Sequence, residues 1–180
     1  MIFTNKTISL VTRCMNRADQ LRQALPTWTT VPEIDRFVIV DWSSDPPLVD
    51  LSSDSRVQIV RKNDETVFDK PRAWNLGLQQ VADIDYIFLI DCDVKILQSP
   101  LPLILPDKPE YYYVFSGVAV GLFGTCIITK EQLQATGGYD ESTGTRRVED
   151  QLFYNRLDCA GFKRKFVLTR QHLQHINHAR

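Results

Sequence analysis

The chain has 180 residues, of which 43% are hydrophobic and 24% are charged, and its formal net charge is -1 at pH 7. This is enough sequence for one globular domain with a substantial core. The balanced charge gives no indication of a basic nucleic-acid-binding surface or an acidic tail, and no apolar run approaches the ~20 residues of a membrane-spanning helix.

The cysteines give a first indication of the cellular compartment. Cys14, Cys92, Cys126 and Cys159 form no CxxC pair, and each lies in or beside an apolar segment. This pattern favours reduced, buried thiols in a cytosolic protein. The N-terminal stretch is a poor signal peptide. We therefore expect a cytoplasmic protein, with peripheral association at the inner face of a membrane as an open alternative.

The first half of the chain alternates apolar runs with stretches of helical spacing. These patterns predict strands at residues 8–12, 36–41, 57–60 and 85–90, and helices at residues 17–28 and 71–81. Strands that alternate with helices favour a parallel, Rossmann-like sheet. No GxGxxG motif follows the first strand, so the dinucleotide-binding version of this fold is disfavoured.

The second half begins with a proline-rich stretch, residues 97–109, which we expect to be irregular. Further strands are predicted at residues 111–115, 125–129 and 166–168, and helices at residues 130–135 and 149–160. Each of these helices is followed by glycine, which commonly ends a helix. The polar loop at residues 140–147 is the expected mobile flap.

The most informative motif is Asp91-Cys92-Asp93, which directly follows the apolar run at residues 86–90. A buried strand has such a run, and ligands bind at the carboxyl ends of strands in open α/β sheets. In an extended conformation, Asp-x-Asp directs both carboxylates to the same side. Two like charges there favour a divalent cation, which often carries a phosphate. The alternative is a solvated turn after the strand.

A pair of histidines, His175 and His178, lies three residues apart near the C-terminus. This spacing lets both imidazoles face one ion if the segment turns, although such pairs are more often surface residues. Combined with the Asp-x-Asp motif, they would form a mixed nitrogen and oxygen site that suits Mn²⁺, with Mg²⁺ as an alternative. His172 is out of step with the pair, and we expect it on the surface.

Two acidic residues, Glu149 and Asp150, stand at the start of a predicted helix. The helix dipole stabilises acids there by ~0.5 kcal/mol without any role in chemistry. The functional alternative is a general base that takes a proton from an acceptor hydroxyl.

A basic set, Arg13, Arg17, Lys70 and Arg72, is predicted on loops at the same edge of the sheet. Arginine and lysine at that edge can contact a diphosphate. Phe68 precedes Lys70 and Arg72 in the sequence, and the base of a nucleotide could stack on its ring. Each of these residues alone is more commonly a surface cation or a core aromatic, so only their combination is suggestive.

Together, these motifs resemble those of inverting GT-A glycosyltransferases, most closely the catalytic domain of the β-1,4-galactosyltransferases and related family-two bacterial sugar transferases. The similarity covers residues 8–180 and is most specific in the second half. It rests on Asn16-Arg17, Phe68-Asp69-Lys70 with Asn75-x-Gly77, Asp91-Cys92-Asp93, Phe123-Gly124, Gly137-Gly138-Tyr139 and Glu149-Asp150. The resemblance implies one α/β domain over residues 1–180 with the GT-A fold. That fold has a Rossmann-like, mainly parallel central sheet, flanking helices and a small second antiparallel sheet.

The same resemblance implies a role for each matching residue. Nucleotide-sugar binding is implied for Thr12, Arg13, Arg17, Asp41, Phe68, Lys70, Arg72, Asn75, Asp91 and Gly124. Within this set, the ring of Phe68 would stack on uracil, and Asp41 would read the uridine. Asp150, together with Glu149, is implied as the catalytic acid pair, with Asp150 as the base. Asp93, His175 and His178 are implied as metal ligands.

The implied reaction moves a sugar from a UDP-sugar to a hydroxyl of a carbohydrate or glycan, by a single inverting displacement that depends on Mn²⁺ or Mg²⁺. Residues 143–148 lack the aromatic, glycine-rich run that the galactosyltransferases carry before the Glu-Asp pair, so the acceptor sugar does not carry over. Arg146 and Arg147 in that run favour an anionic acceptor. The chain ends two residues after His178, so we expect any acceptor subdomain on another biosynthetic subunit or a second copy.

Two other functions remain open from the sequence alone. One is a metal-dependent sugar nucleotidyltransferase. Such enzymes usually have a glycine-rich phosphate-binding loop after the first strand, and residues 12–17 contain no glycine, so this function is disfavoured. The other is a degenerate module that binds nucleotide or carbohydrate without turnover, and the retained acids and histidines argue against it.

Overall fold

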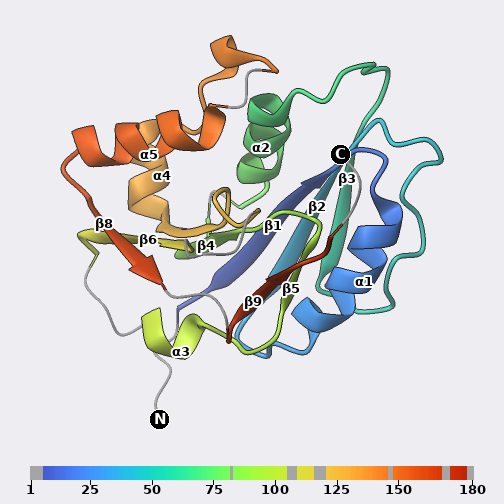
Figure 1. Ribbon diagram of the computed structural model, residues 1–180, viewed down its shortest axis with the longest axis horizontal. Helices are drawn as coiled ribbons and strands as arrows, with labels where there is room; N and C mark the ends of the chain where they lie inside the picture. Colours follow the sequence, from blue (N-terminus) through green and yellow to red (C-terminus); the bar gives the residue numbers. More distant parts are fainter. Residues whose placement is uncertain are drawn as a thin grey trace.

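The computed structural model describes residues 6–81, 83–104, 109–115, 121–145, 148–167 and 171–177. These residues form a mixed α/β fold around two sheets (Figure 1). The strands of the larger sheet are β1 (Ile8–Cys14), β2 (Arg36–Trp42), β3 (Val57–Lys62), β4 (Tyr86–Leu89), β6 (Tyr111–Phe115), β7 (Cys126–Thr129) and β8 (Lys163–Val167). The smaller sheet contains β5 (Val94–Ile96) and β9 (Leu173–His175).

Helices cover both faces of the larger sheet. They are α1 (Ala18–Thr29), α2 (Lys70–Gln79), α3 (Leu101–Ile104), α4 (Lys130–Thr136) and α5 (Glu149–Cys159), with a short 3-10 turn at Glu141–Thr143. Buried side chains of α1 and α3 share one hydrophobic core with β5 and β9. Those of α2 and α5 share a second core on the opposite face. No helix of the described residues is long and apolar enough to cross a membrane.

The order of the larger sheet is β3-β2-β1-β4-β7-β6-β8. Strands β3, β2, β1 and β4 pair in parallel, β7 runs antiparallel to both neighbours, and β8 is parallel to β6. The sheet is therefore mainly parallel, as expected. Because β7 is reversed, the residues just before it lie at the same edge as the residues that follow β1 and β4. This edge positions the candidate site.

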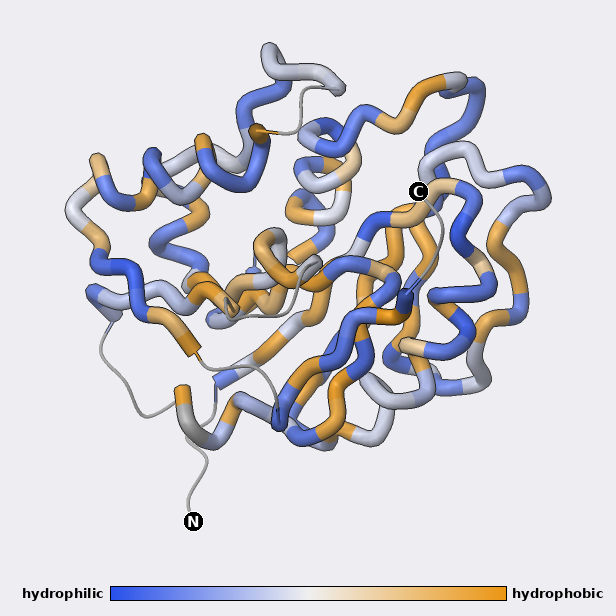
Figure 2. The backbone as a smooth tube through the Cα atoms, in the orientation of Figure 1, coloured by the Kyte–Doolittle hydropathy of each residue, from blue (hydrophilic) through white to orange (hydrophobic). Residues whose placement is uncertain are grey.

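Hydropathy explains why the central strands were predictable. All seven residues of β1 are buried, and so are six of the seven in β2. Figure 2 shows the apolar residues running along the central strands, whereas β8 is largely hydrophilic. Strand β8 lies at the edge of the sheet, where lysine and arginine discourage pairing with another chain.

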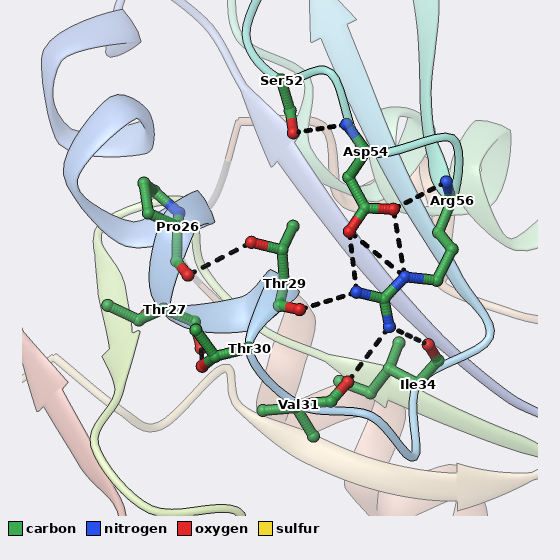
Figure 3. A network of polar contacts seen from close by, with 9 residues as sticks. All are labelled: Pro26, Thr27, Thr29, Thr30, Val31, Ile34, Ser52, Asp54 and Arg56. Atoms are coloured by element: carbon green, nitrogen blue, oxygen red, sulfur yellow. Dashed lines mark hydrogen bonds and ion pairs between the residues drawn. The ribbon is translucent and has the colours of Figure 1, made fainter.

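The end of the sheet away from the candidate site is held by an arginine, Arg56 (Figure 3). Its guanidinium donates to the carbonyls of Thr29, Val31 and Ile34 at 2.6 to 3.2 Å and to both carboxylate oxygens of Asp54 at 2.7 to 3.2 Å. These bonds join the C-terminal end of α1 and the turn into β2 to the start of β3. All the donor nitrogens of this arginine have acceptors.

The structure corrects several expectations. The stretch at residues 97–109 contains the short helix α3, because Pro102 lies in its first turn, where proline is tolerated. The small antiparallel sheet that the resemblance implied is present, but the positions of its strands β5 and β9 were not predicted, since three-residue strands give almost no periodic signal. Cys159 is exposed, whereas Cys14, Cys92 and Cys126 are buried as expected, and all four are free thiols. Residue 168 of the last predicted strand lies outside the described residues, and β8 begins earlier, at Lys163.

Candidate active site

The Asp91-Cys92-Asp93 motif lies at the carboxyl edge of the sheet, directly after β4. The chain turns here rather than remaining extended, because Val94 N donates to the carbonyl of Asp91 at 3.1 Å. Cys92 points into the core and is 5% exposed. The two carboxylates consequently have different partners, Arg13 for Asp91 and His175 for Asp93, instead of the common direction expected for an extended Asp-x-Asp.

Asp91 faces the proposed base Asp150 across Gly124. A methyl group added to Gly124 would lie 3.0 Å from Asp150 Oδ2 and 3.3 Å from Asp91 Oδ2. Gly124 precedes β7, Asp91 follows β4, and Asp150 is in the first turn of α5. The reversed strand therefore brings three segments that are distant in sequence around one small space. A side chain at position 124 would fill that space.

Arg13 lies beneath these acids at the end of β1. Its side chain is 4% exposed and forms an ion pair with Asp91, and its Nη2 lies 3.8 Å from Glu149 Oε1. The guanidinium carbon stands 4.2 Å from the ring centre of Trp74. Burial alone would lower the pKa of Arg13, but Asp91 and Asp150 together raise it above its ordinary value. Arg13 therefore stays charged.

Glu149 is 3% exposed and is neutralised by two cations. Besides Arg13, Lys70 Nζ at the start of α2 lies 3.1 Å from its Oε1. Asp69 begins this helix by accepting a hydrogen bond from Arg72 N at 3.1 Å, with Pro71 in the first turn. This cap fixes the position of Lys70 relative to α5.

Asp150 has an unusual protonation equilibrium. Its pKa is raised to about 7: burial is the largest cause and Asp91 and Glu149 act in the same direction, whereas Arg13 and Lys70 act against them. The hydroxyl of Tyr139 lies 3.5 Å from its Oδ1. A carboxylate with a pKa near neutrality, at the mouth of a sheet, is well matched to proton abstraction at physiological pH.

Asp93 and His175 come together through the small sheet. Val94 pairs with His175 between β5 and β9, and Ile176 N donates to the carbonyl of Asp93 at 2.7 Å. His175 Nε2 lies 3.6 Å from Asp93 Oδ2, and Arg17 Nη1 lies 3.9 Å from the same oxygen. A methyl group on Gly121 would lie 2.6 Å from the His175 ring, so a larger residue at position 121 would displace this ring.

These two side chains supply one oxygen and one nitrogen donor that suit a divalent cation. The third expected ligand, His178, lies outside the described residues. Within the described ranges, no group of three or more His, Cys, Asp or Glu side chains could hold a metal. His172, expected on the surface, is instead buried, with Nδ1 at 3.2 Å from the carbonyl of Gln98. The pairing of β9 with β5 turns it inward.

Of three other expected nucleotide-binding residues, Asp41 and Asn75 have their polar atoms engaged within the protein, whereas the buried hydroxyl of Thr12 has no hydrogen-bond partner among the described residues. Asp41 is fully buried; its oxygens accept from Ser44 N and Leu48 N at 3.0 Å, and it forms an ion pair with Arg61. Asn75 exchanges hydrogen bonds with the backbone of Tyr139 at 2.7 and 2.9 Å. Thr12 is fully buried within β1. These side chains shape the loops around the site.

Arg72 and Phe68 lie on the α2 side of the same edge. Arg72 Nη2 is 3.1 Å from Glu65 Oε1, and its guanidinium lies 5.3 Å from the ring centre of Trp42. Phe68 is half-buried, and the Arg13 guanidinium lies 5.8 Å from its ring centre. Both side chains remain partly accessible at the edge of the sheet.

An aromatic stack beneath the acids was not predicted. Trp74 stacks on Tyr139 at 5.7 Å between ring centres, and Tyr139 stacks on Phe153 of α5 at 4.3 Å. We call Trp74, Tyr139 and Phe153 the aromatic column. The sequence signal available was the helical position of Trp74 in α2 and of Phe153 in α5, which indicates burial but not mutual contact.

The fold is similar to that of solved GT-A glycosyltransferases. The catalytic domain of Drosophila β1,4-galactosyltransferase 7, in complex with xylobiose, matches with a TM-score of 0.70 and 18% identity over 96% of this chain and 71% of that chain. The Pyrobaculum calidifontis mannosyltransferase in complex with GDP-Man and Mn²⁺ matches with a TM-score of 0.72 and 12% identity over 93% of this chain and 56% of that one.

A third solved structure, GalNAc-T7 with UDP, GalNAc and Mn²⁺, matches with a TM-score of 0.77 and 14% identity over 98% of this chain and 45% of that chain. The chain thus spans about half the length of the last two structures. No protein-family model and no curated protein sequence matches. At these identities the likeness establishes the GT-A fold, as the motifs implied.

Proposed function

We propose that the chain is a metal-dependent inverting glycosyltransferase that moves a sugar from a UDP-sugar to a hydroxyl of a carbohydrate acceptor. One observation carries this proposal: Asp91 and Asp150 face the same space above Gly124, at the carboxyl edge of a GT-A fold. Mn²⁺ accompanies three of the structures with the same fold: a Drosophila galactosyltransferase with UDP-Gal, a mannosyltransferase with GDP-Man, and GalNAc-T7 with UDP and GalNAc.

In this proposal Asp150 is the general base. With its pKa near 7 it is substantially ionised at neutral pH, and it takes the proton of the acceptor hydroxyl as that oxygen attacks the anomeric carbon. The diphosphate leaves from the opposite face, so an α-linked donor gives a β-linked product. Asp91, across Gly124, orients the donor sugar or ribose. Glu149, paired with Lys70, fixes the first turn of α5.

Asp93 and His175, with His178 as the expected third ligand, would hold the divalent cation. When bound, the cation offsets the charge that develops on the diphosphate leaving group. Arg17 lies beside Asp93, where it would contact the diphosphate, and Phe68 and Arg72 would contact the nucleoside on the α2 side. Asp41 and Asn75 would act indirectly, through the loops that they hold.

The test is transfer and hydrolysis by the Asp150→Asn variant, with a panel of UDP-sugars and Mn²⁺. Loss of a general base costs roughly 10²–10⁴-fold in kcat, while UDP binding should stay within a few fold. Near-wild-type turnover by Asp150→Asn would rule out the assigned base. Binding of UDP and Mn²⁺ without any turnover by the wild-type protein would instead favour a binding module.

A further inference from the structure

Arg13 is placed where a diphosphate ligand would not be expected. Its side chain is 4% exposed, and it is enclosed by Asp91 above and the ring of Trp74 below. Arg17, four residues later, is 34% exposed and stands at Asp93. The resemblance assigned both arginines to the donor. The structure separates them, because only Arg17 is accessible at the edge of the sheet.

The charge balance around Arg13 indicates a different role. Among the residues that the structure describes, two cations, Arg13 and Lys70, accompany three acids, Asp91, Glu149 and Asp150, so the described cations are one fewer than the acids. Without Arg13, a single lysine would face all three. Buried carboxylates that lie close together favour protonation of one of the group, and a protonated carboxyl cannot act as a general base.

The aromatic column connects this charge cluster to the base. Arg13 lies against Trp74, Trp74 stacks on Tyr139, and Tyr139 stacks on Phe153, which is three residues after Asp150 on α5. A desolvated guanidinium over an aromatic face is stabilised by cation–π attraction. Arg13 Nε has no hydrogen-bond partner among the described residues, so ring contact and the acids, rather than backbone carbonyls, hold this side chain.

We propose that Arg13 is a positioning residue of the transferase proposed above, which holds Asp91 and Glu149 in place through ion pairs at the buried side of the site, and that it is not a ligand of the donor diphosphate. This inference rests on the proposed function. Among the described residues, the charged or titratable groups that act on Asp150 from the elements around it are Arg13, Lys70, Asp91, Cys126, Tyr139, Glu149 and Tyr154. Arg13 is the buried cation among them.

The experiment compares Arg13→Met, Arg13→Lys and Arg17→Met with the full-length wild-type chain. UDP with Mn²⁺ is the binding probe, and UDP-sugar turnover gives kcat and KM. For Arg13→Met we expect UDP affinity within about threefold of wild type and kcat lower by about 100-fold, the usual cost of a misplaced catalytic group. The kcat of Arg13→Lys should be at least tenfold higher than that of Arg13→Met. Arg17→Met should instead weaken UDP binding.

The pH profile separates a positioning role from general damage to the fold. Because Arg13 lowers the pKa of Asp150, its replacement should move the acid limb of kcat/KM to higher pH, and Arg13→Lys should move it back. An Arg13→Met variant that loses UDP affinity tenfold with an unchanged kcat and limb would overturn the inference. If Arg13→Met does not fold, Arg13→Lys carries the same comparison with Arg17→Met.

Failure of the proposed function gives a different result. If the wild-type protein turns over no UDP-sugar, the transferase proposal fails, whereas the ionisation of Asp150 can still be followed by carboxyl-carbon NMR. A midpoint for Asp150 that is higher in Arg13→Met than in wild type, and closer to wild type in Arg13→Lys, supports the inference without turnover. An unchanged midpoint contradicts it.

Discussion

Arg56 and Arg13 lie at opposite ends of the larger sheet, and their side chains have different kinds of partners. Arg56 donates to three backbone carbonyls and to Asp54, which stands two residues away (Figure 3). Arg13 instead meets acids from distant segments and an aromatic ring. Neutral carbonyls satisfy a cation and hold the fold together. Where several acids surround one cation, not every carboxylate is neutralised, and an ionised carboxylate can act as a base. Such buried, unbalanced charge lowers the stability of the fold.

The largest expected effect concerns the acids near Arg13. Gly124→Ala should lower kcat on the order of 10²-fold, because its methyl group would stand 3.0 Å from Asp150 and 3.3 Å from Asp91. Turnover of a UDP-sugar measures it. The matched control is Gly161→Ala, where the added methyl meets nothing within 4 Å but φ is +91°. That variant should lose about 1 kcal/mol of stability and keep its kcat. Normal turnover by Gly124→Ala would mean that the two acids do not share a ligand.

The second prediction tests the structural end. Arg56→Ala should lower the free energy of unfolding by about 2 kcal/mol, since it leaves several carbonyls and Asp54 without their donor. Urea denaturation measures this loss. The kcat of the folded variant should remain within twofold of wild type. Arg22→Ala, which removes an exposed arginine paired with Asp19 at 3.6 Å, should cost less than about 0.5 kcal/mol. Equal losses in the two variants would contradict the comparison.

The third prediction concerns pH. Burial raises the pKa of Asp150 to about 7, and a general base acts only when ionised. We therefore expect kcat/KM to rise roughly tenfold per pH unit below pH 7 and to level above it, in a pH series of initial rates. A limb centred near pH 4 would show that Asp150 is not the titrating base.

The smallest expected effect is on stability. A carboxyl whose pKa is higher in the folded than in the unfolded chain makes the wild-type protein less stable as pH rises from about 4 to about 7. Asp150→Asn lacks this titration, so its melting temperature should exceed that of wild type by a few degrees at pH 8 and by little at pH 4. Calorimetry at both pH values measures the difference. A gain that is the same at both would contradict the raised pKa.

Most of the larger elements could be predicted from sequence, for identifiable reasons. Strands β2 and β4 contain the continuous apolar runs Phe37-Val38-Ile39-Val40 and Ile87-Phe88-Leu89, and β1 is rich in β-branched and apolar residues; such stretches are typical of strands buried on both faces. Helix α4 has a capping box at Thr129 and Gln132, and it ends at Gly137 with φ +67°. These signals are local. The short strands β5 and β9 have none, because each exists only through pairing with the other.

The candidate site was predicted less evenly. The acids at positions 91, 93 and 150 were predicted because carboxylates are conspicuous at the ends of strands and helices, and their roles stay a prediction. Asp41 and Asn75 were assigned to the nucleotide, but the structure occupies their polar atoms with the backbone of neighbouring loops. Sequence does not distinguish a polar group that faces a ligand from one that faces a backbone amide, because both need the same residue types.

By itself, the order of residues determined the parallel α/β architecture and which acids stand at its carboxyl edge, since burial and helix ends leave local patterns. Only the tertiary structure decided that Gly124 separates Asp91 from Asp150, that Arg13 is enclosed while Arg17 is accessible, and that Trp74, Tyr139 and Phe153 stack. These relations depend on the reversed direction of β7 and the packing of α2 and α5 on one face. Contacts between segments so distant in the chain have no local signature.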